Sequence, residues 1–413
     1  MKKQNIITIG ILLLAFFFVK EIWGFTEPQL INVDKPNEAT ANKYYVDLDA
    51  GSNGDGSIGN PWNSLQNAKS GMTGKPRPAY LYMKGSETLS GEFAWNQGGN
   101  GTGQELVITA WGSETATITG YFRPASDWII FDGKSFTSPQ LIFDGSNVET
   151  AVQQTEGATD IIIWRCRIRN SNSVGIHVVD NIKIFNSVVH SHIRVAIYNS
   201  HGTNIEIRNN IIYGPSSVSA KGVQINPHDS GRVVKDIVVS GNAIYGFYEK
   251  AIATLSGIDP GGFLDGAKIY NNLVWDCNQA AIHFSSEVSG RIEDVQVYGN
   301  TLHGGVINDQ SGTTTFRNNI ITGSVNSSGF VAYSNNNQGA SCLASTTSSS
   351  SDFLKLKSTA SDCINKGATG LGLTSDYFGN SRDSVPDIGA HEYGGGTPPD
   401  TTPPAAPSGL RVR

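Results

Sequence analysis

Three stretches of the sequence decide the fold: DIIIWRCRIRN at 160–170, NIKIFNSVVHS at 181–191 and NIEIRNNIIYG at 204–214. They share apolar residues at the second and fourth positions, usually Asn or Gly at the sixth, and two mostly apolar residues after the seventh. Alternate residues of a strand face the same side, so the pattern predicts a strand, a bend at the polar pair and a second short strand. The same pattern recurs at 236–246, 266–276, 294–304 and 313–323.

The seventh position of this repeat measures the length of each unit. Successive copies lie 19 to 32 residues apart, at Cys166, Ser187, Asn210, Asn242, Asn272, Asn300 and Asn319. A constant unit with variable spacing indicates loops of different length on one stacked coil, which is a parallel β-solenoid. Coils stack at about 4.8 Å, so the turn amides can hydrogen bond from coil to coil. We therefore expect an all-β parallel β-helix with these Asn residues in one inner turn.

A further strand recurs later in each unit, at 175–178, 196–199, 222–225, 251–254 and 281–284. The apolar second residue of each copy is predicted to point into the coil and its neighbours outward. The outward residues just before each copy are Val174, Val195, Lys221, Lys250 and Ala280. The outward residues at the third position are His177, Tyr198, Gln224, Ala253 and His283.

The composition agrees with a solenoid and excludes several other classes of protein. The 413 residues include 47 Gly, and only 16% are charged, against about a quarter in typical soluble domains. Abundant Gly and Asn favour tight turns, and the shortage of helix formers argues against a helical bundle or an ordinary α/β enzyme. The net charge of −6, without a basic patch, argues against nucleic acid as a partner.

The N-terminus, 1–24, has the pattern of a secretory signal peptide. Lys2 and Lys3 precede an apolar run at 6–19, which is short for a membrane span of roughly 20 residues. An uncleaved anchor is the alternative. We expect a chain that is secreted or at the cell surface, extracellular or periplasmic, with no stable membrane span after signal removal, and monomeric.

Four cysteines are present. Cys342 and Cys363 bracket the Ser-rich stretch 345–351 and are candidates for a disulfide, which export would permit. Cys166 and the coil of Cys277 are four coils apart, roughly 19 Å at the stacking rise. A disulfide requires Cα atoms within about 7 Å, so these two are not expected to pair.

The repeats resemble those of the right-handed parallel β-helix proteins of the pectate-lyase-like superfamily. The segment 44–68 is similar to their N-terminal strand and capping helix, and PDIGAHEY at 386–393 to a closing strand of secreted bacterial members. The resemblance covers 44–393 and implies the fold, whereas the superfamily holds lyases, hydrolases, epimerases and non-enzymatic proteins. Residues 394–413 join a Gly/Pro/Thr linker to a stretch that resembles the start of a fibronectin type III domain.

The resemblance does not extend to a complete catalytic motif. The paired Asp residues of polygalacturonases are replaced at the aligned positions by Lys221 and Lys250. Elimination from a uronate polysaccharide needs a cation for the sugar carboxylate, a base and an acid. We predict one lysine as the cation and the other as the base, with Tyr198 or His283 as the acid.

Predicted substrate-binding residues lie on the same strands or on long loops beside them. The two longest spacings follow Asn210 and Asn242, and their loops leave the coils of the two lysines. Loops held by a rigid scaffold commonly form substrate sites. The substrate-binding candidates are His177, Gln224, His228 and Arg232.

Several alternatives stay open. The two lysines can be ordinary solvated residues, with Lys250 paired to Glu249. A glycoside hydrolase would use paired carboxylates, and the available acids are Asp229, Glu249, Asp259 and Glu287. A non-enzymatic glycan-binding or adhesive solenoid is the third. No cofactor is firmly indicated; calcium is possible, because Asp47, Asp49, Asn53 and Asp55 have calcium-like spacing, although a capping turn is favoured.

Overall fold

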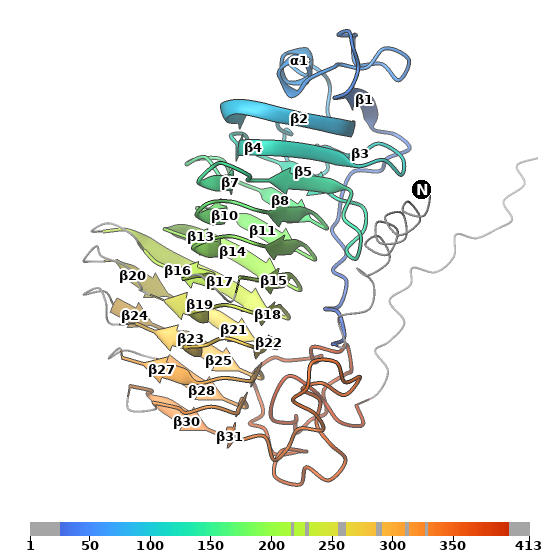
Figure 1. The fold of residues 1–413 in the computed structure, drawn as a ribbon. Coiled ribbons are helices and arrows are strands. Elements are labelled where there is room, and N and C mark those ends of the chain that lie inside the picture. Colours follow the sequence, from blue (N-terminus) through green and yellow to red (C-terminus); the bar gives the residue numbers. More distant parts are fainter. Residues whose placement is uncertain are drawn as a thin grey trace, which may run out of the picture.

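The computed structural model describes residues 25–215, 219–227, 231–254, 262–285, 291–309, 314–326 and 329–395. These residues form 31 strands and one helix. The strands join in a single sheet that winds into an elongated stack of coils (Figure 1). The predicted all-β parallel β-helix is confirmed. The predicted signal peptide and the linker with its fibronectin-like start lie outside the described residues, apart from 394–395.

Each coil contributes strands to three ladders, which we number in chain order. Ladder I contains β1 (Asn42–Asp47), β2 (Ala79–Trp95), β3 (Leu106–Ala110), β5 (Ile129–Asp132), β8 (Ile161–Trp164), β11 (Ile182–Phe185), β14 (Gly202–Arg208), β17 (Val233–Ser240), β20 (Phe263–Asp265), β21 (Lys268–Tyr270), β24 (Arg291–Glu293), β25 (Val295–Tyr298), β28 (Thr314–Arg317) and β30 (Ala332–Ser334). Ladder II begins on the second half of β2 and contains β4 (Ala116–Pro124), β6 (Leu141–Asp144), β9 (Arg167–Arg169), β12 (Val188–His190), β15 (Ile211–Tyr213), β18 (Ala243–Tyr245), β22 (Leu273–Trp275), β26 (Thr301–Leu302), β29 (Ile320–Ile321) and β31 (Asn337–Gln338). Ladder III starts beside the end of β4 and contains β7 (Thr150–Gln153), β10 (Val174–Val178), β13 (Val195–Asn199), β16 (Lys221–Ile225), β19 (Lys250–Thr254), β23 (Ala280–Phe284) and β27 (Val306–Asn308).

The helix α1 (Leu65–Gly71) covers the N-terminal end of the stack (Figure 1). The Ser64 side chain accepts a hydrogen bond from the Asn67 amide and caps the helix. Leu65 and Ala68 are buried in the continuous core of the coils. The predicted strand and capping helix near the N-terminus are therefore present. None of the described residues forms a helix with the length and hydropathy of a membrane span.

The predicted asparagine ladder lies inside the turn between ladders I and II. Asn210, Asn242, Asn272, Asn300 and Asn319 are fully buried. Each of the first four donates from its side-chain amide to the Oδ1 of the next, at 2.9–3.0 Å. The backbone amides of the same residues donate to the same oxygens. Each coil is therefore tied to the next through its turn.

Residues 25–41 form a strap that runs outside the coils from the C-terminal end to the N-terminal end (Figure 1). At one end the Tyr377 hydroxyl donates to the Thr26 carbonyl at 2.9 Å. Midway the Asn209 amide donates to the Gln29 carbonyl at 2.7 Å. Further on, the Lys35 amine pairs with a buried carboxylate on β5. The strap therefore links coils that the ladders join only step by step.

The C-terminal segment, 339–395, is mostly irregular and packs on the outer side of ladder II. The candidate pair Cys342 and Cys363 forms a disulfide, whereas Cys166 and Cys277 are free thiols. The expectation of a closing strand at 386–393 is wrong: those residues form no strand. The backbone of this segment makes isolated hydrogen bonds instead of a strand ladder. For example, the Gly389 amide donates to the Asn318 carbonyl.

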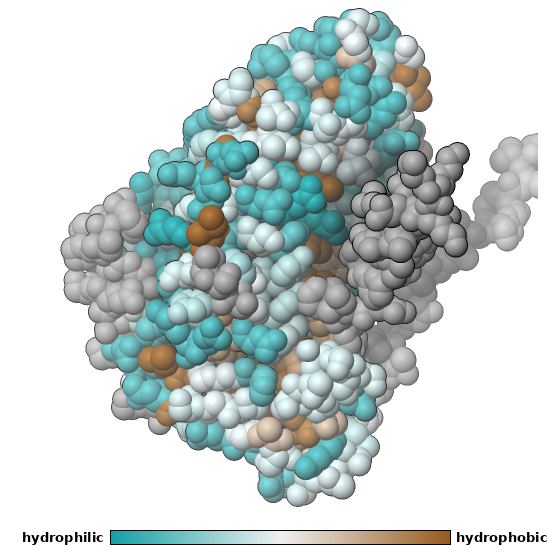
Figure 2. All heavy atoms as spheres, in the orientation of Figure 1, coloured by the Kyte–Doolittle hydropathy of each residue, from teal (hydrophilic) through white to brown (hydrophobic). Residues whose placement is uncertain are grey.

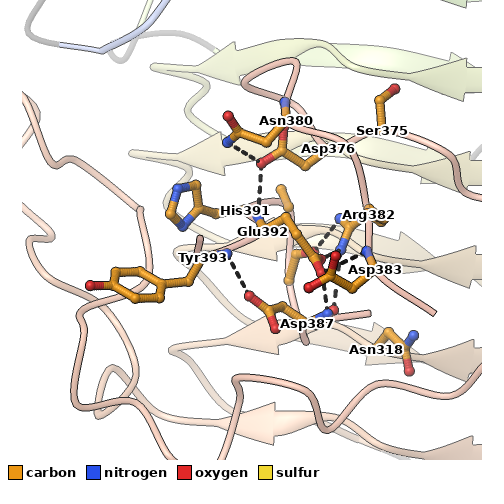
Figure 3. Close-up of polar contacts among 12 residues, drawn as sticks. Asn318, Ser375, Asp376, Asn380, Arg382, Asp383, Asp387, His391, Glu392 and Tyr393 are labelled. Atoms are coloured by element: carbon orange, nitrogen blue, oxygen red, sulfur yellow. Dashed lines mark hydrogen bonds and ion pairs between the residues drawn. The ribbon is translucent and has the colours of Figure 1, made fainter. Parts of the chain in front are cut away.

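A cluster of charged side chains holds this segment together (Figure 3). Arg382 and Glu392 are each 1% exposed and form an ion pair at 3.1 Å. Glu392 also accepts from the Asp383 and Asp387 backbone amides. Asp376 accepts from the Glu392 amide. A buried charge that is paired and hydrogen bonded is tolerated, so these side-chain contacts hold this end together where no strand ladder does.

Candidate functional site

The candidate site is the outward face of ladder III, where the structure confirms the predicted alignment of strands. Val195 on β13 lies opposite Lys221 on β16, and Tyr198 lies opposite Gln224. Because Val223 lies opposite Ile252, the register places Lys221 beside Lys250 on β19. One coil further, Lys250 lies opposite Ala280. His283 lies opposite Ala253 on the same pair of strands. The two columns of residues read from the sequence are therefore neighbours in space.

The charges of both lysines act on one described carboxylate, that of Glu249. The Lys221 amine lies 2.9 Å from Glu249, whose other oxygen accepts from the Ser219 hydroxyl at 2.5 Å. The alternative paired Glu249 with Lys250; among the described residues, Glu249 forms its ion pair with Lys221. Burial raises the pKa of Glu249, but the hydrogen bonds from Ser219 and Lys221 and the two lysine charges outweigh it and hold that pKa below its ordinary value. Lys250 is 6% exposed, so it is no ordinary solvated lysine.

His283 has an acidic partner that the sequence did not indicate. Its Nε2 lies 2.9 Å from Asp309, which follows β27 on the next coil. The imidazole is 7% exposed, and its Nδ1 is buried without a hydrogen-bond partner in the described structure. A carboxylate can only accept, so Nε2 carries a proton in this pair. The arrangement orients the ring in the way that acid–base histidines are oriented.

A second polar group starts from His177 and crosses several coils. His177 Nε2 lies 2.8 Å from the Ser200 hydroxyl, which lies 2.9 Å from His201 Nδ1. His201 Nε2 lies 3.1 Å from Glu156, and Arg232 holds the same Glu156 oxygen at 2.7 Å. The His177 and Tyr198 rings are 5.1 Å apart, so this group adjoins the Tyr198 column. Arg232 thus lies on this group rather than beside the lysines' ion pair.

The remaining candidates are placed as follows. Gln224 is buried at 7% exposure between the Tyr198 and Ala253 positions. His228, Asp229, Asp259 and Glu287 lie outside the described residues. Within the described ranges no group of three or more His, Cys, Asp or Glu side chains is arranged to hold a metal ion. Asp47 instead pairs with Lys84 at 3.0 Å.

One exposed aromatic residue on this face was missed by the sequence patterns. Tyr248 is 43% exposed and directly precedes Glu249. The face of the molecule drawn in Figure 2 is mostly hydrophilic or of intermediate hydropathy, with scattered hydrophobic residues. An exposed ring beside charged groups is a common way to bind sugars, because the ring contacts the apolar face of a pyranose. Its position in a loop between two strands gives no periodic signal in the sequence.

The comparisons with known proteins agree with this architecture. The family model "Right handed beta helix region" matches residues 180–347. No curated protein matches the chain. Among solved structures, a pectate lyase superposes with a TM-score of 0.55 at 15% identity, covering 88% of this chain and 97% of that chain. A rhamnogalacturonan lyase gives a TM-score of 0.38 at 13% identity, covering 77% and 97%. The A-module of a mannuronan C-5 epimerase from Azotobacter vinelandii gives 0.38 at 15% identity, covering 66% and 89%. The family match and the pectate lyase superposition establish a right-handed parallel β-helix.

Proposed function

We propose that the chain is a secreted enzyme that cleaves an acidic polysaccharide by β-elimination on the outward face of ladder III. The observation that carries the proposal is the register that sets Lys221 and Lys250 side by side, with Glu249 bonded to the first. Two lysine amines on neighbouring coils suit the recognition of a chain of anionic sugars. The fold similarity to a pectate lyase supports a polysaccharide as the substrate.

The residues divide the chemistry among them. Lys221, which forms an ion pair with Glu249, neutralises the sugar carboxylate. Lys250 takes the proton from the carbon next to that carboxylate, the electron pair forms a C=C bond, and the glycosidic C–O bond breaks. Tyr198 or His283 gives a proton to the departing oxygen. Asp309 orients the His283 ring for this step.

The substrate-binding part of the proposal uses the flanks of the same face. His177 and Gln224 occupy the column of Tyr198 on the neighbouring coils. Arg232, bonded to Glu156, and the loop residue His228 would contact sugars beyond the cleaved bond. Tyr248 adds an exposed ring on which a sugar can stack.

A screen of pectate, alginate and glycosaminoglycans tests the proposal, with and without added calcium. Elimination produces an unsaturated sugar that absorbs in the ultraviolet, and we expect this absorbance to rise together with reducing ends. Reducing ends without absorbance would instead support hydrolysis by two carboxylates, for which Glu249 and Asp309 are the described acids on this face. Binding without any cleavage would support an adhesive solenoid.

The secreted location rests on the pattern at 1–24 and is tested separately. We expect the protein recovered from culture medium or periplasm to have lost this segment. Sequencing of its N-terminus decides the matter, because a retained segment in the membrane fraction would indicate an anchor instead.

A further inference from the structure

A second cluster of polar side chains lies at the C-terminal end of β13, apart from the two lysines. Ser200 and His201 follow this strand directly, and Glu156 follows β7 on an earlier coil. The three form a continuous chain of contacts, from the Ser200 hydroxyl to His201 Nδ1 at 2.9 Å and from His201 Nε2 to Glu156 at 3.1 Å. Hydroxyl, imidazole and carboxylate in this order are the components of a nucleophilic serine site.

The direction of each hydrogen bond follows from the carboxylate. Glu156 can only accept, so the proton of a neutral His201 lies on Nε2, and Nδ1 is left as an acceptor. Burial and the charge of Arg232 hold the pKa of His201 below its ordinary value, which favours the neutral ring. The hydroxyl proton of Ser200 therefore points at His201 Nδ1. A base in this position can activate the Ser200 oxygen by accepting its proton.

The surroundings complete the arrangement on both sides. Arg232 holds Glu156 at 2.7 Å, and this hydrogen bond and charge keep the pKa of the carboxyl below its ordinary value, so Glu156 is ionised. On the other side His177 Nε2 lies 2.8 Å from the Ser200 oxygen. Because the hydroxyl proton is committed to His201, the oxygen accepts from His177, which supplies a donor beside the atom where negative charge develops.

The chain also contains a Ser–His pair that lacks these features. Ser191 contacts His190 Nδ1 at 2.8 Å, again between sequence neighbours. Ser191 is exposed, whereas Ser200 is 7% exposed. In the described structure His190 makes no ion pair with a carboxylate. The Ser191–His190 pair therefore shows that neighbours in sequence can make a Ser–His contact without the other parts of such a site.

We propose that Ser200, His201 and Glu156 form a serine esterase site that removes acyl or methyl ester groups from a carbohydrate. Ser200 Oγ attacks the ester carbonyl while its proton passes to His201 Nδ1, and the alcohol leaves with that proton. Water, activated by the same imidazole, then releases the acid from the acyl-serine. The site lies two residues beyond Tyr198, so an ester on a bound polysaccharide would reach it, but the proposal holds whether or not the lysines perform an elimination.

The test uses the intact protein and two probes, a fluorophosphonate and p-nitrophenyl acetate. We expect the fluorophosphonate to modify Ser200, located by mass spectrometry, and Ser200→Ala to abolish both labelling and ester hydrolysis. His201→Ala should lower hydrolysis by about 100-fold or more, and Glu156→Gln by about tenfold or more. Ser191→Ala, the matched control, should leave both unchanged.

Two results would overturn the proposal. One is a folded wild-type protein in which Ser200 stays unlabelled at probe concentrations that label a known serine esterase. The other is hydrolysis that survives in Ser200→Ala. The wild-type labelling needs no substitution, so the outcome does not depend on whether a variant folds, and circular dichroism of each variant checks the fold.

Discussion

At the scale of single residues, Glu249 sets the charge of the ladder III face. It accepts from Ser219 and pairs with Lys221, and the charges of Lys221 and Lys250 both act on its pKa. The carboxylate offsets part of the positive charge of the two neighbouring lysines. The residue therefore moderates a repulsion that would otherwise act against folding.

The lowered pKa of Glu249 makes a prediction about acid stability. A carboxyl whose pKa is lower in the folded chain stabilises the fold above its unfolded pKa, and this contribution is lost as pH falls through the folded value. Glu249→Gln should therefore lower the melting temperature at pH 7 and have a progressively smaller effect below about pH 4.5. Calorimetry of both proteins from pH 7 to pH 3 measures the difference. A gap that stays constant over this range would contradict the assignment.

The two lysines should differ sharply from other lysines in activity. Lys221→Ala and Lys250→Ala should each lower turnover on the polysaccharide identified by the screen by about 100-fold or more, the scale of a lost acid–base group. Lys235→Ala is the matched control, because Lys235 is half exposed and lies 3.6 Å from Asp265 on ladder I. Initial rates from ultraviolet absorbance check this. Near-normal rates in both lysine variants would contradict a catalytic role for Lys221 and Lys250.

The residues of the site divide into those that a repeat pattern predicts and those that it does not. The strand register of Lys221, Lys250 and Tyr198 was predictable because each coil repeats it. Asp309, Ser200 and the pairing of Glu249 with Lys221 were not anticipated. Such partners belong to loop ends, where the local backbone decides which of several nearby side chains meet.

At the scale of the element, the turn between ladders I and II explains why Asn recurs in pairs. The first member, as at Asn209, Asn271 and Asn318, has a φ of 52–56°, in the left-handed region that Asn tolerates better than most residues. The second member points inward and joins the ladder of amides. One residue type thus serves two separate requirements, backbone shape and buried hydrogen bonding.

Removing one amide from the middle of this ladder should be costly. Asn272→Ala deletes the acceptor of the Asn242 backbone and side-chain amides, of which only the side-chain amide keeps another partner, the Ile207 carbonyl. It also removes the side-chain donor to the Val239 carbonyl. Each unpaired buried group costs about 1–3 kcal/mol, so we expect a loss of about 3 kcal/mol or more in unfolding free energy. Urea denaturation measures it. Gln296→Ala, on the exposed side of β25, should stay within about 0.5 kcal/mol, and equal effects of the two changes would argue against the ladder's role.

The repeats were predictable from sequence, whereas the end of the solenoid was not. The segment 386–393 has strand-like character, yet Asp387 and Glu392 take their hydrogen bonds within an irregular loop cluster. Their partner Arg382 lies outside the segment. A pattern read locally cannot reveal that side-chain charges, rather than a neighbouring strand, satisfy the backbone.

At the scale of the whole molecule, stability depends on closing the sides and end of a stack in which each coil contacts mainly its neighbours. The C-terminal segment covers the stacked rings of Tyr245 and Trp275, which lie 4.4 Å apart. Phe25, at the start of the strap, packs on both. Two distant parts of the chain therefore protect the same apolar surface.

Breaking the charged cluster should weaken the packing of the C-terminal segment on the coils. Arg382→Ala leaves the Glu392 carboxylate buried without its cation, and burial already raises the pKa of Glu392. Loss of one partner of a buried pair costs about 3–5 kcal/mol. Equilibrium denaturation followed by tryptophan fluorescence should show this loss. Arg123→Ala removes an ion pair on the surface, with Glu92, and should cost less than about 1 kcal/mol.

The strap has a consequence for how the chain reaches its final shape. Thr26 receives its hydrogen bond from Tyr377, 351 residues later, so the first described residues find their place only after almost the whole protein has been synthesised. Coils can form in order as they emerge, since their contacts are with adjacent units. The strap can dock only after the C-terminal segment has been made. Its docking then connects the first coils with the last ones. The N-terminal residues of the chain are thus held in place by its C-terminal segment, which is synthesised last.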